Sequence, residues 1–515
     1  MLYDVYKYGA KGDGKTLDTV AIQKAVDDCF ENGGGRVVVP AGNYLVGKIV
    51  LKDNVTFEIG SGATLTASPD IDDYPTSEGF SGSIFNQGFF IDTRCERRAV
   101  IYACSAKNIA IVGRGTIDGC HQQFLVGRKD ADQAKRFQYD MHNVEERFYA
   151  HGPEFKWRPI LVFIEDSEDV FVDGVNFKNA PCYTLQFRSS RNINITNINI
   201  RNYIGADNAD GIHFSSCTDV RISNCDLECG DDCIAIDSND GTPSERFAVS
   251  NCMFVSRNNC FRIFTNLGGE DKKRELLPWG KVCDIAISNC VVKEASSFVY
   301  VNVDCGIVER VSVTNASGKI RRLGTTFLIT THNAKVNQIT FANWNFTSRG
   351  VGYIYSDSDN SITNIKLLNL DIEVCPTTQL YGNGLPEMPK KPNGQPLYWL
   401  SHYVPYFLQI IRAEDISIRY LSVHWGETDI PDINEVGEVK ELIPLWPMPV
   451  SCEPHWPVLK AEKIKNLEID GFKGEAFGEH PYILELDEVD STKFYRSDIK
   501  KEDIRAIKCR EILYK

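Results

Sequence analysis

Apolar and polar residues alternate in short segments that recur through the middle of the chain. Their β-branched content and two-residue alternation are typical of strands, and no helical periodicity lies between them. The first residues of successive segments are 23, 27, 27, 38, 26, 28 and 26 positions apart. Periods of this size indicate a solenoid, in which each coil buries its apolar face against its neighbours. We therefore predict a parallel β-helix from the segments VFVDGVNF (from Val170), INITNINI (Ile193), VRISNCDL (Val220), FAVSNCMF (Phe247), IAISNCVV (Ile285), VSVTNASG (Val311), ITFANWNF (Ile339) and IKLLNLDI (Ile365).

One position of this repeat is an asparagine in seven of the segments. Asparagine tolerates left-handed backbone geometry in a turn, and a stack of asparagines can satisfy backbone groups there. In three segments a cysteine follows, and we predict that Cys225, Cys252 and Cys290 stack in the interior as small apolar side chains, rather than bind a metal or act in redox chemistry. The asparagines are Asn197, Asn224, Asn251, Asn289, Asn315, Asn343 and Asn369.

A second column of strands follows the turns, and its second and fourth positions are apolar in every row. These positions must face inward, because neighbouring side chains of a strand point to opposite faces. The third and fifth positions should then form two exposed columns. The strands are TLQFRS (from Thr184), GIHFSS (Gly211), CIAIDS (Cys233), CFRIFT (Cys260), FVYVNV (Phe298) and TFLITT (Thr326).

The two ends of the repeat differ from its middle. Between Leu17 and Phe30, apolar residues recur at helical spacing, and three glycines from Gly33 end the run, which predicts a helix that covers the N-terminal end of the core. The apolar residues are Val20, Ala21, Ala25, Val26, Cys29 and Phe30. Residues 36–68 should supply the first strands. After Val374 the repeat loosens, and two aromatic insertions, at 397–407 and 442–458, interrupt coils that begin near Ile416 and Leu467. These insertions fit a hydrophobic cover for the C-terminal end, or loops that stack on sugars.

Length and charge limit the classes of protein that remain. A chain of 515 residues could hold two or three domains, but the continuous repeat favours one β-helix domain over residues 1–515. Residues 1–70 form its cap and first coils, and 375–515 its irregular C-terminal coils. The net charge of −14 argues against a nucleic acid or an anionic membrane as partner. No apolar run has the length of a membrane span.

Cysteine usage gives an expectation about the compartment. The 17 cysteines show no CxxC pairs and no regular histidine partners, so they fit neither a metal site nor a disulfide framework. The N-terminal residues lack the charged-then-apolar pattern of a signal peptide. Reduced thiols in a cytoplasm are the simpler interpretation, with a trimmed export signal as the alternative.

Three aspartates precede strands of the second column. Asp210 ends the sequence NAD, and Asp231 and Asp232 belong to GDD one coil later, so that Asp210 and Asp232 occupy the same position on successive coils. Two crowded carboxylates repel, and one of them usually has a raised pKa. Aspartate is a common turn residue, but three converging carboxylates beside His, Arg, Tyr and Asn favour a chemical role.

The residue types indicate which chemistry these carboxylates perform. There is no Ser–His pair, metal-ligand spacing or phosphate loop with them, which suggests cleavage of a glycosidic bond. One acid would protonate the leaving oxygen, and the others would activate water or form a covalent intermediate. A calcium site, as in a polysaccharide lyase, is the competing use of clustered aspartates.

At these residues the chain resembles glycoside hydrolase family 28, the polygalacturonase and rhamnogalacturonase family. The resemblance covers YGAKGDGKTLDT near the N-terminus, GRGTIDG at 113–119, RPILVFIEDSEDVFVDGV at 158–175, and the motifs NADGIHF and GDDCIAI. It implies a right-handed, single-stranded, pectate-lyase-like β-helix. It also implies that Asp231 is the general acid and that Asp210 and Asp232 activate water, with inversion of configuration. It implies no cofactor and no metal.

The second half of the family pattern is missing. Where the family has Gly-His-Gly this chain has RNNCFRI, so Asn259 replaces the histidine, and FVYVNV replaces Arg-Ile-Lys, so that Tyr300 and Asn302 stand at the basic positions. His213 replaces an acid common in the family. Arg262 adds a positive charge on the same face, and His213 would join it below about pH 6.5. The predicted substrate-binding residues are Asn208, Gln186, His213, Asn259, Arg262, Tyr300 and Asn302.

These replacements change the expected substrate. In galacturonate-cleaving members the basic pair binds the sugar carboxylate. Here we expect a neutral or sparsely charged sugar opposite Tyr300 and Asn302, within a pectic or related plant-type poly- or oligosaccharide. Any acidic group should contact Arg262. A carbohydrate-binding β-helix without activity and a β-helix polysaccharide lyase are the alternative functions.

Overall fold

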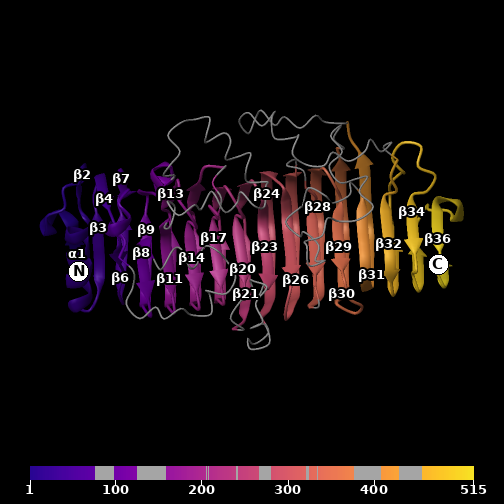
Figure 1. Cartoon of the computed structure of the whole chain (residues 1–515), viewed down its shortest axis with the longest axis horizontal. Coiled ribbons are helices and arrows are strands. Elements are labelled where there is room, and N and C mark those ends of the chain that lie inside the picture. The colour runs from indigo at the N-terminus through magenta and orange to yellow at the C-terminus, as the bar shows by residue number, and fades with distance from the viewer. Residues whose placement is uncertain are drawn as a thin grey trace. The chain divides into compact units, whose positions relative to one another are not determined.

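The computed structural model describes residues 1–75, 98–124, 158–204, 206, 208–238, 242–265, 280–320, 324–332, 334–375, 407–427 and 455–515. The chain forms two compact units, one of Met1–Arg257 and one that starts at Asn258. Within each unit, parallel strands lie side by side as successive coils (Figure 1). The fold is therefore the parallel β-helix that the repeat predicts. A single domain over residues 1–515 stays a prediction.

In the described part of the first unit, the strands form three parallel columns. The first contains β1 (Leu2–Asp4), β3 (Gly35–Val39), β6 (Val55–Ile59), β9 (Lys107–Gly113), β12 (Glu168–Asp173), β15 (Arg191–Thr196), β18 (Thr218–Ser223) and β21 (Ser244–Ser250). The second contains β2 (Asp13–Leu17), β4 (Gly42–Val46), β7 (Ala63–Ala67), β10 (Thr116–Asp118), β13 (Asn176–Lys178), β16 (Asn199–Arg201), β19 (Asp226–Cys229) and β22 (Met253–Ser256). The third contains β5 (Ile49–Val50), β8 (Ala99–Cys104), β11 (Ile160–Glu165), β14 (Leu185–Arg188), β17 (Ile212–Ser215) and β20 (Ile234–Asp237).

In the described part of the second unit, long strands form one column and shorter strands another. The long column contains β24 (Lys281–Ala295), β26 (Ile307–Ile320), β28 (Lys335–Ser348), β30 (Ile362–Val374) and β31 (Leu408–Trp425), followed by β33 (Asn466–Asp470), β35 (Ser491–Tyr495) and β37 (Glu511–Tyr514). The other contains β23 (Asn259–Thr265), β25 (Ser297–Val303), β27 (Phe327–Thr331), β29 (Gly352–Ser356), the start of β31, β32 (Leu459–Ile464), β34 (Leu484–Asp487) and β36 (Ile504–Ile507). Short 3-10 helices are η1 (Val5–Tyr8), η2 (Ile71–Asp73), η4 (His121–Phe124) and η11 (Lys501–Asp503).

The predicted N-terminal helix is present as α1 (Thr19–Glu31), which packs against β3, β5 and β6. Its buried face differs in part from the predicted one. Val20 and Phe30 are 63% and 40% exposed, whereas Ile22 and Val26 are fully buried. Residues four apart lie on the same face of a helix, so a face centred on Ile22 and Val26 leaves Val20 outside. The assignment of Val20 and Phe30 to the covering face was wrong.

The strand register confirms the predicted repeat within each unit. Segments that were aligned by pattern pair residue for residue in parallel strands. The later coils also start where the sequence predicts, because Ile365 pairs with Ile416, and Ile416 with Leu467. The other pairs are Val170–Ile193, Ile193–Val220 and Val220–Phe247 in the first unit, and Ile285–Val311, Val311–Ile339 and Ile339–Ile365 in the second.

The asparagine stack is also confirmed. All seven predicted asparagines have left-handed backbones, with φ between 54° and 57°. In the second unit their amides form a ladder, in which Asn315 donates to Asn289 at 3.1 Å, and Asn343 donates to Asn315 at 3.0 Å. Cys225, Cys252 and Cys290 are buried beside it. The described cysteines carry free thiols.

The inward positions of the site-bearing strands are confirmed, but the exposure of their outward positions is not. All twelve predicted inward side chains are fully buried. Of the outward side chains, only Arg188 and Arg262 are partly exposed, and the rest are buried. One reason is that outward side chains cover one another, since Tyr300, Leu328 and Tyr353 pack into an apolar cluster on successive strands. The prediction of two exposed columns was wrong.

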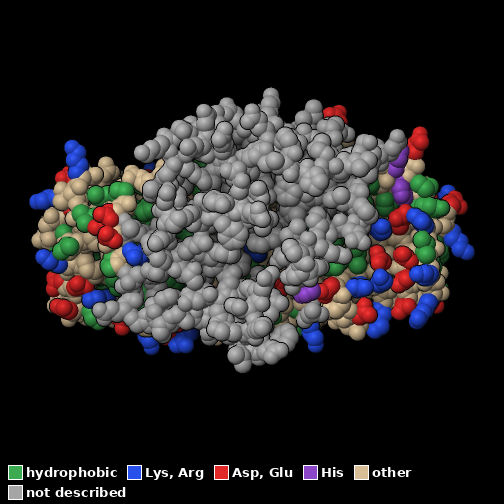
Figure 2. Space-filling view, in the orientation of Figure 1, with side chains coloured by type: hydrophobic (Ala, Val, Ile, Leu, Met, Phe, Trp, Pro, Cys, Tyr) green, Lys and Arg blue, Asp and Glu red, His purple; other side chains and the backbone are tan. Residues whose placement is uncertain are grey.

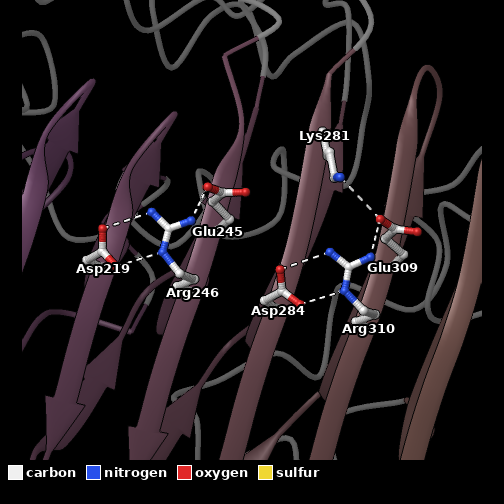
Figure 3. Close-up of polar contacts among 7 residues, drawn as sticks. All are labelled: Asp219, Glu245, Arg246, Lys281, Asp284, Glu309 and Arg310. Carbon is white, nitrogen blue, oxygen red and sulfur yellow. Dashed lines mark hydrogen bonds and ion pairs between the residues drawn. The ribbon is translucent and has the colours of Figure 1, made fainter.

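Ion pairs between successive coils follow the outer surface of each unit (Figure 3). In the first unit Arg246 donates to both carboxylate oxygens of Asp219, at 2.7 and 2.9 Å. In the second unit Arg310 contacts Asp284 in the same way, at 2.6 and 2.9 Å. Exposed pairs of this kind add little stability. Acidic and basic side chains also lie interspersed on the described part of the visible face (Figure 2).

Two parts of the sequence-based interpretation lie almost wholly outside the described residues. These are the aromatic insertions at 397–407 and 442–458.

Within the described residues, no helix has the length and apolar character to cross a bilayer.

Candidate active site

The three predicted aspartates lie in turns that immediately precede strands of the third column. Asp210 precedes β17, and Asp231 and Asp232 lie between β19 and β20. Ile212 pairs with Ile234, so Asp210 and Asp232 stand two residues before paired positions. The amide of Gly211 donates to the carbonyl of Asp232 at 2.9 Å, which fixes this alignment. The predicted shared position is therefore confirmed.

Two glycines next to the aspartates allow the coils to approach closely. A Cβ atom on Gly211 would lie 2.4 Å from the carbonyl oxygen of Cys233, and one on Gly230 would lie 2.3 Å from the carbonyl oxygen of Ala206. Both contacts are with backbone, which cannot rotate away. Any larger residue at either glycine would displace the adjacent aspartate.

Asp231 differs from the other two acids in its exposure and its contacts. It is partly exposed, while Asp210 and Asp232 are 4% and 2% exposed. The backbone amide of Asn208 donates to Oδ2 of Asp231 at 3.3 Å. The side-chain oxygen of Asn208 in turn accepts from Arg158 Nη2 at 3.1 Å. Asp231 is therefore the member of the three that solvent or a leaving group reaches most readily.

His213 lies between two carboxylates. Its Nδ1 is 3.2 Å from Oδ2 of Asp210, and its Nε2 is 2.7 Å from Oδ2 of Asp237. The ring is 7% exposed, and Tyr183 lies against it with 4.7 Å between ring centroids. Burial by itself would lower the pKa of His213, but the hydrogen bonds and charges of the two aspartates raise it from 6.5 to about 10. The expectation that His213 is charged only below about pH 6.5 was wrong, because it considered the strand pattern and not these two partners.

This pKa predicts how stability depends on pH. The pKa of His213 is higher in the folded state than in the unfolded state, so its stabilisation is complete below pH 6.5 and is lost as the pH rises to about 10. We expect the free energy of unfolding, measured by chemical denaturation, to fall across this interval. His213→Gln should flatten the decline. Equal slopes in the two proteins would contradict the assignment.

The outward column continues from His213 toward the N-terminus as a mixed polar and aromatic surface. Gln186 pairs in register with His213 and is buried, and within the described residues its Oε1 has no hydrogen-bond partner. Farther along, the hydroxyl of Tyr102 contacts buried Glu165, and Lys48 Nζ lies 4.3 Å from the centre of the Tyr102 ring. That Gln186 binds a ligand stays a prediction.

The remaining predicted residues gather in the second unit. Arg262 pairs in register with Tyr300, and its Cζ lies 5.9 Å from the Tyr300 ring centre and 4.7 Å from that of Phe264. Asn259 accepts a hydrogen bond from a serine hydroxyl on β25 at 2.6 Å, and Asn302 donates to a threonine hydroxyl on β27 at 3.2 Å. That these residues share one site with the aspartates stays a prediction.

Sequence reasoning missed three residues that contact His213 or Asn208. Asp237 occupies an outward fifth position beside Ser215 on the next coil, so the column pattern could have identified it as a partner for His213. Arg158 precedes β11 and Tyr183 precedes β14. Neither lies within the alternating strand pattern, and no signal in the sequence points to their contacts.

The part of the chain that contains the aspartates is similar to known proteins. Residues 29–256 match the model of glycosyl hydrolases family 28. A probable polygalacturonase of Vitis vinifera is 31% identical over 45% of this chain and 43% of its own length. An exo-poly-alpha-D-galacturonosidase of Dickeya chrysanthemi is 30% identical over 50% of this chain and 45% of its own length. The chain thus spans less than half the length of these curated relatives.

A solved structure supports the fold. The family 28 exopolygalacturonase of Yersinia enterocolitica matches with a TM-score of 0.54 and 19% identity, over 84% of this chain and 76% of that one. At this identity the likeness concerns the fold alone, and it agrees with the predicted right-handed parallel β-helix. The family match contains all three aspartates and His213, whereas Asn259, Arg262, Tyr300 and Asn302 lie beyond it.

Proposed function

We propose that this chain, whose residues 29–256 match the model of glycosyl hydrolases family 28, is a member of that family and hydrolyses a glycosidic bond in a pectic or related plant-type poly- or oligosaccharide. In this proposal Asp231 is the general acid that protonates the leaving oxygen. Asp210 and Asp232 activate the water that attacks the sugar from the opposite side, which inverts the configuration at the anomeric carbon.

The observation that carries the proposal is the arrangement of the three carboxylates. Asp210 and Asp232 occupy equivalent positions on adjacent coils, and both are buried. Asp231 is adjacent in sequence and partly exposed. Adjacent parallel strands are about 4.8 Å apart, so the paired acids can act on one water molecule. The more accessible acid is suited to meet a leaving group.

Two observations support a substrate class, the names of the relatives and the residues of the second unit. The Vitis vinifera and Dickeya chrysanthemi relatives are named a probable polygalacturonase and an exo-poly-alpha-D-galacturonosidase. In this chain, Tyr300 and Asn302 stand where the family has bases, and neither carries a positive charge. Burying an unpaired carboxylate is costly. We therefore propose that the sugar opposite Tyr300 and Asn302 is neutral or sparsely charged, with Arg262 as the contact for any acidic group.

A product screen tests both parts of the proposal. The protein is incubated with oligogalacturonides and with neutral-sugar oligosaccharides, and products are followed by mass, ultraviolet absorbance and proton NMR. We expect products that have gained one water, without ultraviolet absorbance, whose first anomer is opposite in configuration to the cleaved bond. Neutral or branched substrates should be cleaved faster than unsubstituted oligogalacturonides.

The other outcomes identify the alternatives. Unsaturated products that absorb ultraviolet light and require calcium would indicate a lyase. Binding of a glycan without any product would indicate a carbohydrate-binding protein. Retention of configuration would remove the water-activating role from Asp210 and Asp232. Fast cleavage of oligogalacturonides that is undiminished by Arg262→Ala would show that the missing bases do not set specificity.

A further inference from the structure

We propose that His213 is a positioning residue that is anchored on Asp237 and holds the Asp210 carboxylate in its ionised form. The catalytic part of this inference rests on the function proposed above. The residue would act through Asp210, without contact to the reacting atoms.

The two hydrogen bonds of His213 determine its protonation. Ionised Asp210 and Asp237 can only accept hydrogen bonds, at 3.2 and 2.7 Å from the two ring nitrogens. A neutral imidazole has one donor and can satisfy one carboxylate, whereas an imidazolium satisfies both. Asp210, His213 and Asp237 are all at least nine-tenths buried, where an unsatisfied charge is costly. The geometry therefore favours an imidazolium with two carboxylates.

Asp237 has the contacts of an anchor. Its Oδ2 accepts from His213 and also from the hydroxyl of Ser215, at 3.0 Å. Among the described residues, the register partners of His213 on the neighbouring strands are neutral, Gln186 on β14 and Ala235 on β20. Tyr183 lies against the ring from the segment before β14. The ring is thus held on one side by a strand residue and presents its other nitrogen to Asp210.

The consequence for catalysis is electrostatic. Asp210 shares its position with Asp232 on the next coil, and two neighbouring carboxylates favour protonation of one of them. A protonated Asp210 cannot accept a proton from water. The imidazolium offsets this repulsion and favours the ionised form of Asp210.

The test is the pH profile of kcat/KM for His213→Gln. Glutamine keeps a hydrogen-bond donor but has no charge, so the pKa of Asp210 should rise and the acid limb should move up by about one to three pH units. The assay uses trigalacturonate, or, if the wild type leaves it intact, the oligosaccharide that the wild type cleaves fastest in the product screen. An unmoved acid limb with a lowered kcat would overturn the inference.

Two further variants make the result specific. Ser215→Ala, which contacts Asp237 but not Asp210, should leave the acid limb in place. Asp237→Asn can keep the hydrogen bond but removes a charge, so the pKa of His213 should fall, and nitrogen-15 NMR should show the ring losing its proton at a lower pH than in the wild type. If His213→Gln does not fold, an unchanged titration of the His213 ring in Asp237→Asn overturns the inference instead.

Failure of the inference and failure of the proposed function give different results. If Asp210→Asn is inactive and the acid limb of His213→Gln does not move, only the role of His213 is wrong. If Asp210→Asn keeps the wild-type rate, the proposed function itself is wrong.

Nitrogen-15 NMR of histidine-labelled protein tests the protonation of His213 and needs no turnover. The signal that is lost in His213→Gln should show two protonated nitrogens at neutral pH, and a neutral tautomer would contradict the inference.

Discussion

Asp231→Asn is expected to lower kcat by about 10²- to 10⁴-fold, because asparagine cannot donate a proton to the leaving oxygen. The variant should fold almost normally. Asp231 is partly exposed, and an asparagine oxygen can still accept the hydrogen bond from the amide of Asn208. Asp210→Asn and Asp232→Asn should be comparably inactive, since each removes a carboxylate that activates water. Steady-state kinetics and circular dichroism measure the two effects separately.

A comparison of leaving groups separates the acid from the bases. A glycoside with a nitrophenyl leaving group needs little protonation, so the Asp231→Asn defect should be much smaller on it than on an oligosaccharide. The defects of Asp210→Asn and Asp232→Asn should be similar on both substrates. The matched control is Asp226→Asn on β19, on the same coil as Asp231. It removes a carboxylate that pairs with Arg201 of the preceding coil at 2.7 Å. Equal losses for Asp231→Asn on both substrates would show that Asp231 is not the acid.

Most of the fold could be predicted because a solenoid repeats its constraints. Each coil must place apolar residues at the same inward positions. A wrong alignment of one segment is therefore revealed by its disagreement with the next segment. The asparagine turns add a second, independent signal, since left-handed geometry excludes most residues. The positions of Asp210 and Asp232 follow from the same register. The pairing of strands that are far apart in the sequence therefore follows from aligning the repeats with one another.

What alternation could not predict was burial on the outside of the strands. A period of two tells which side of a strand a residue faces, but not what packs on that side. His213 was expected to face solvent, and its buried contacts with Asp210 and Asp237 come from two different coils. Similarly, Val20 has the spacing of a core residue within a short helix, although Ile22 sets the face that is buried.

The substrate site depends on segments that repeats do not constrain. Arg158 reaches Asn208 from a position 50 residues earlier in the chain. Such contacts are made by side chains in turns, where one substitution or insertion changes the direction of approach. The residues around Tyr300 belong to the second unit, and their combination with the aspartates stays a prediction from register. Specificity is therefore less predictable from the sequence than the three acids are.

Ile234→Asp is expected to abolish soluble folding of the protein. Ile234 is fully buried on β20, and its register partner Ile212 is equally buried on the preceding coil. An aspartate there would have to be ionised without a partner or protonated at a cost, and either penalty consumes much of the about 5–15 kcal/mol that stabilises a typical protein. Expression in the soluble fraction and thermal unfolding measure the outcome.

Two controls distinguish a buried charge from a general intolerance of β20 and its neighbours. Ile234→Val removes one methyl group and should cost about 0.5–1.5 kcal/mol, which leaves the protein soluble. Met253→Asp introduces the same charge on β22 of the same unit, at a side chain that is 39% exposed, and should be tolerated. A soluble Ile234→Asp protein with the Tm of the wild type would mean that this side chain does not face the core. The register that turns Ile234 inward also aligns Asp232 with Asp210. That result would therefore also contradict the proposal that Asp210 and Asp232 act as a pair of bases.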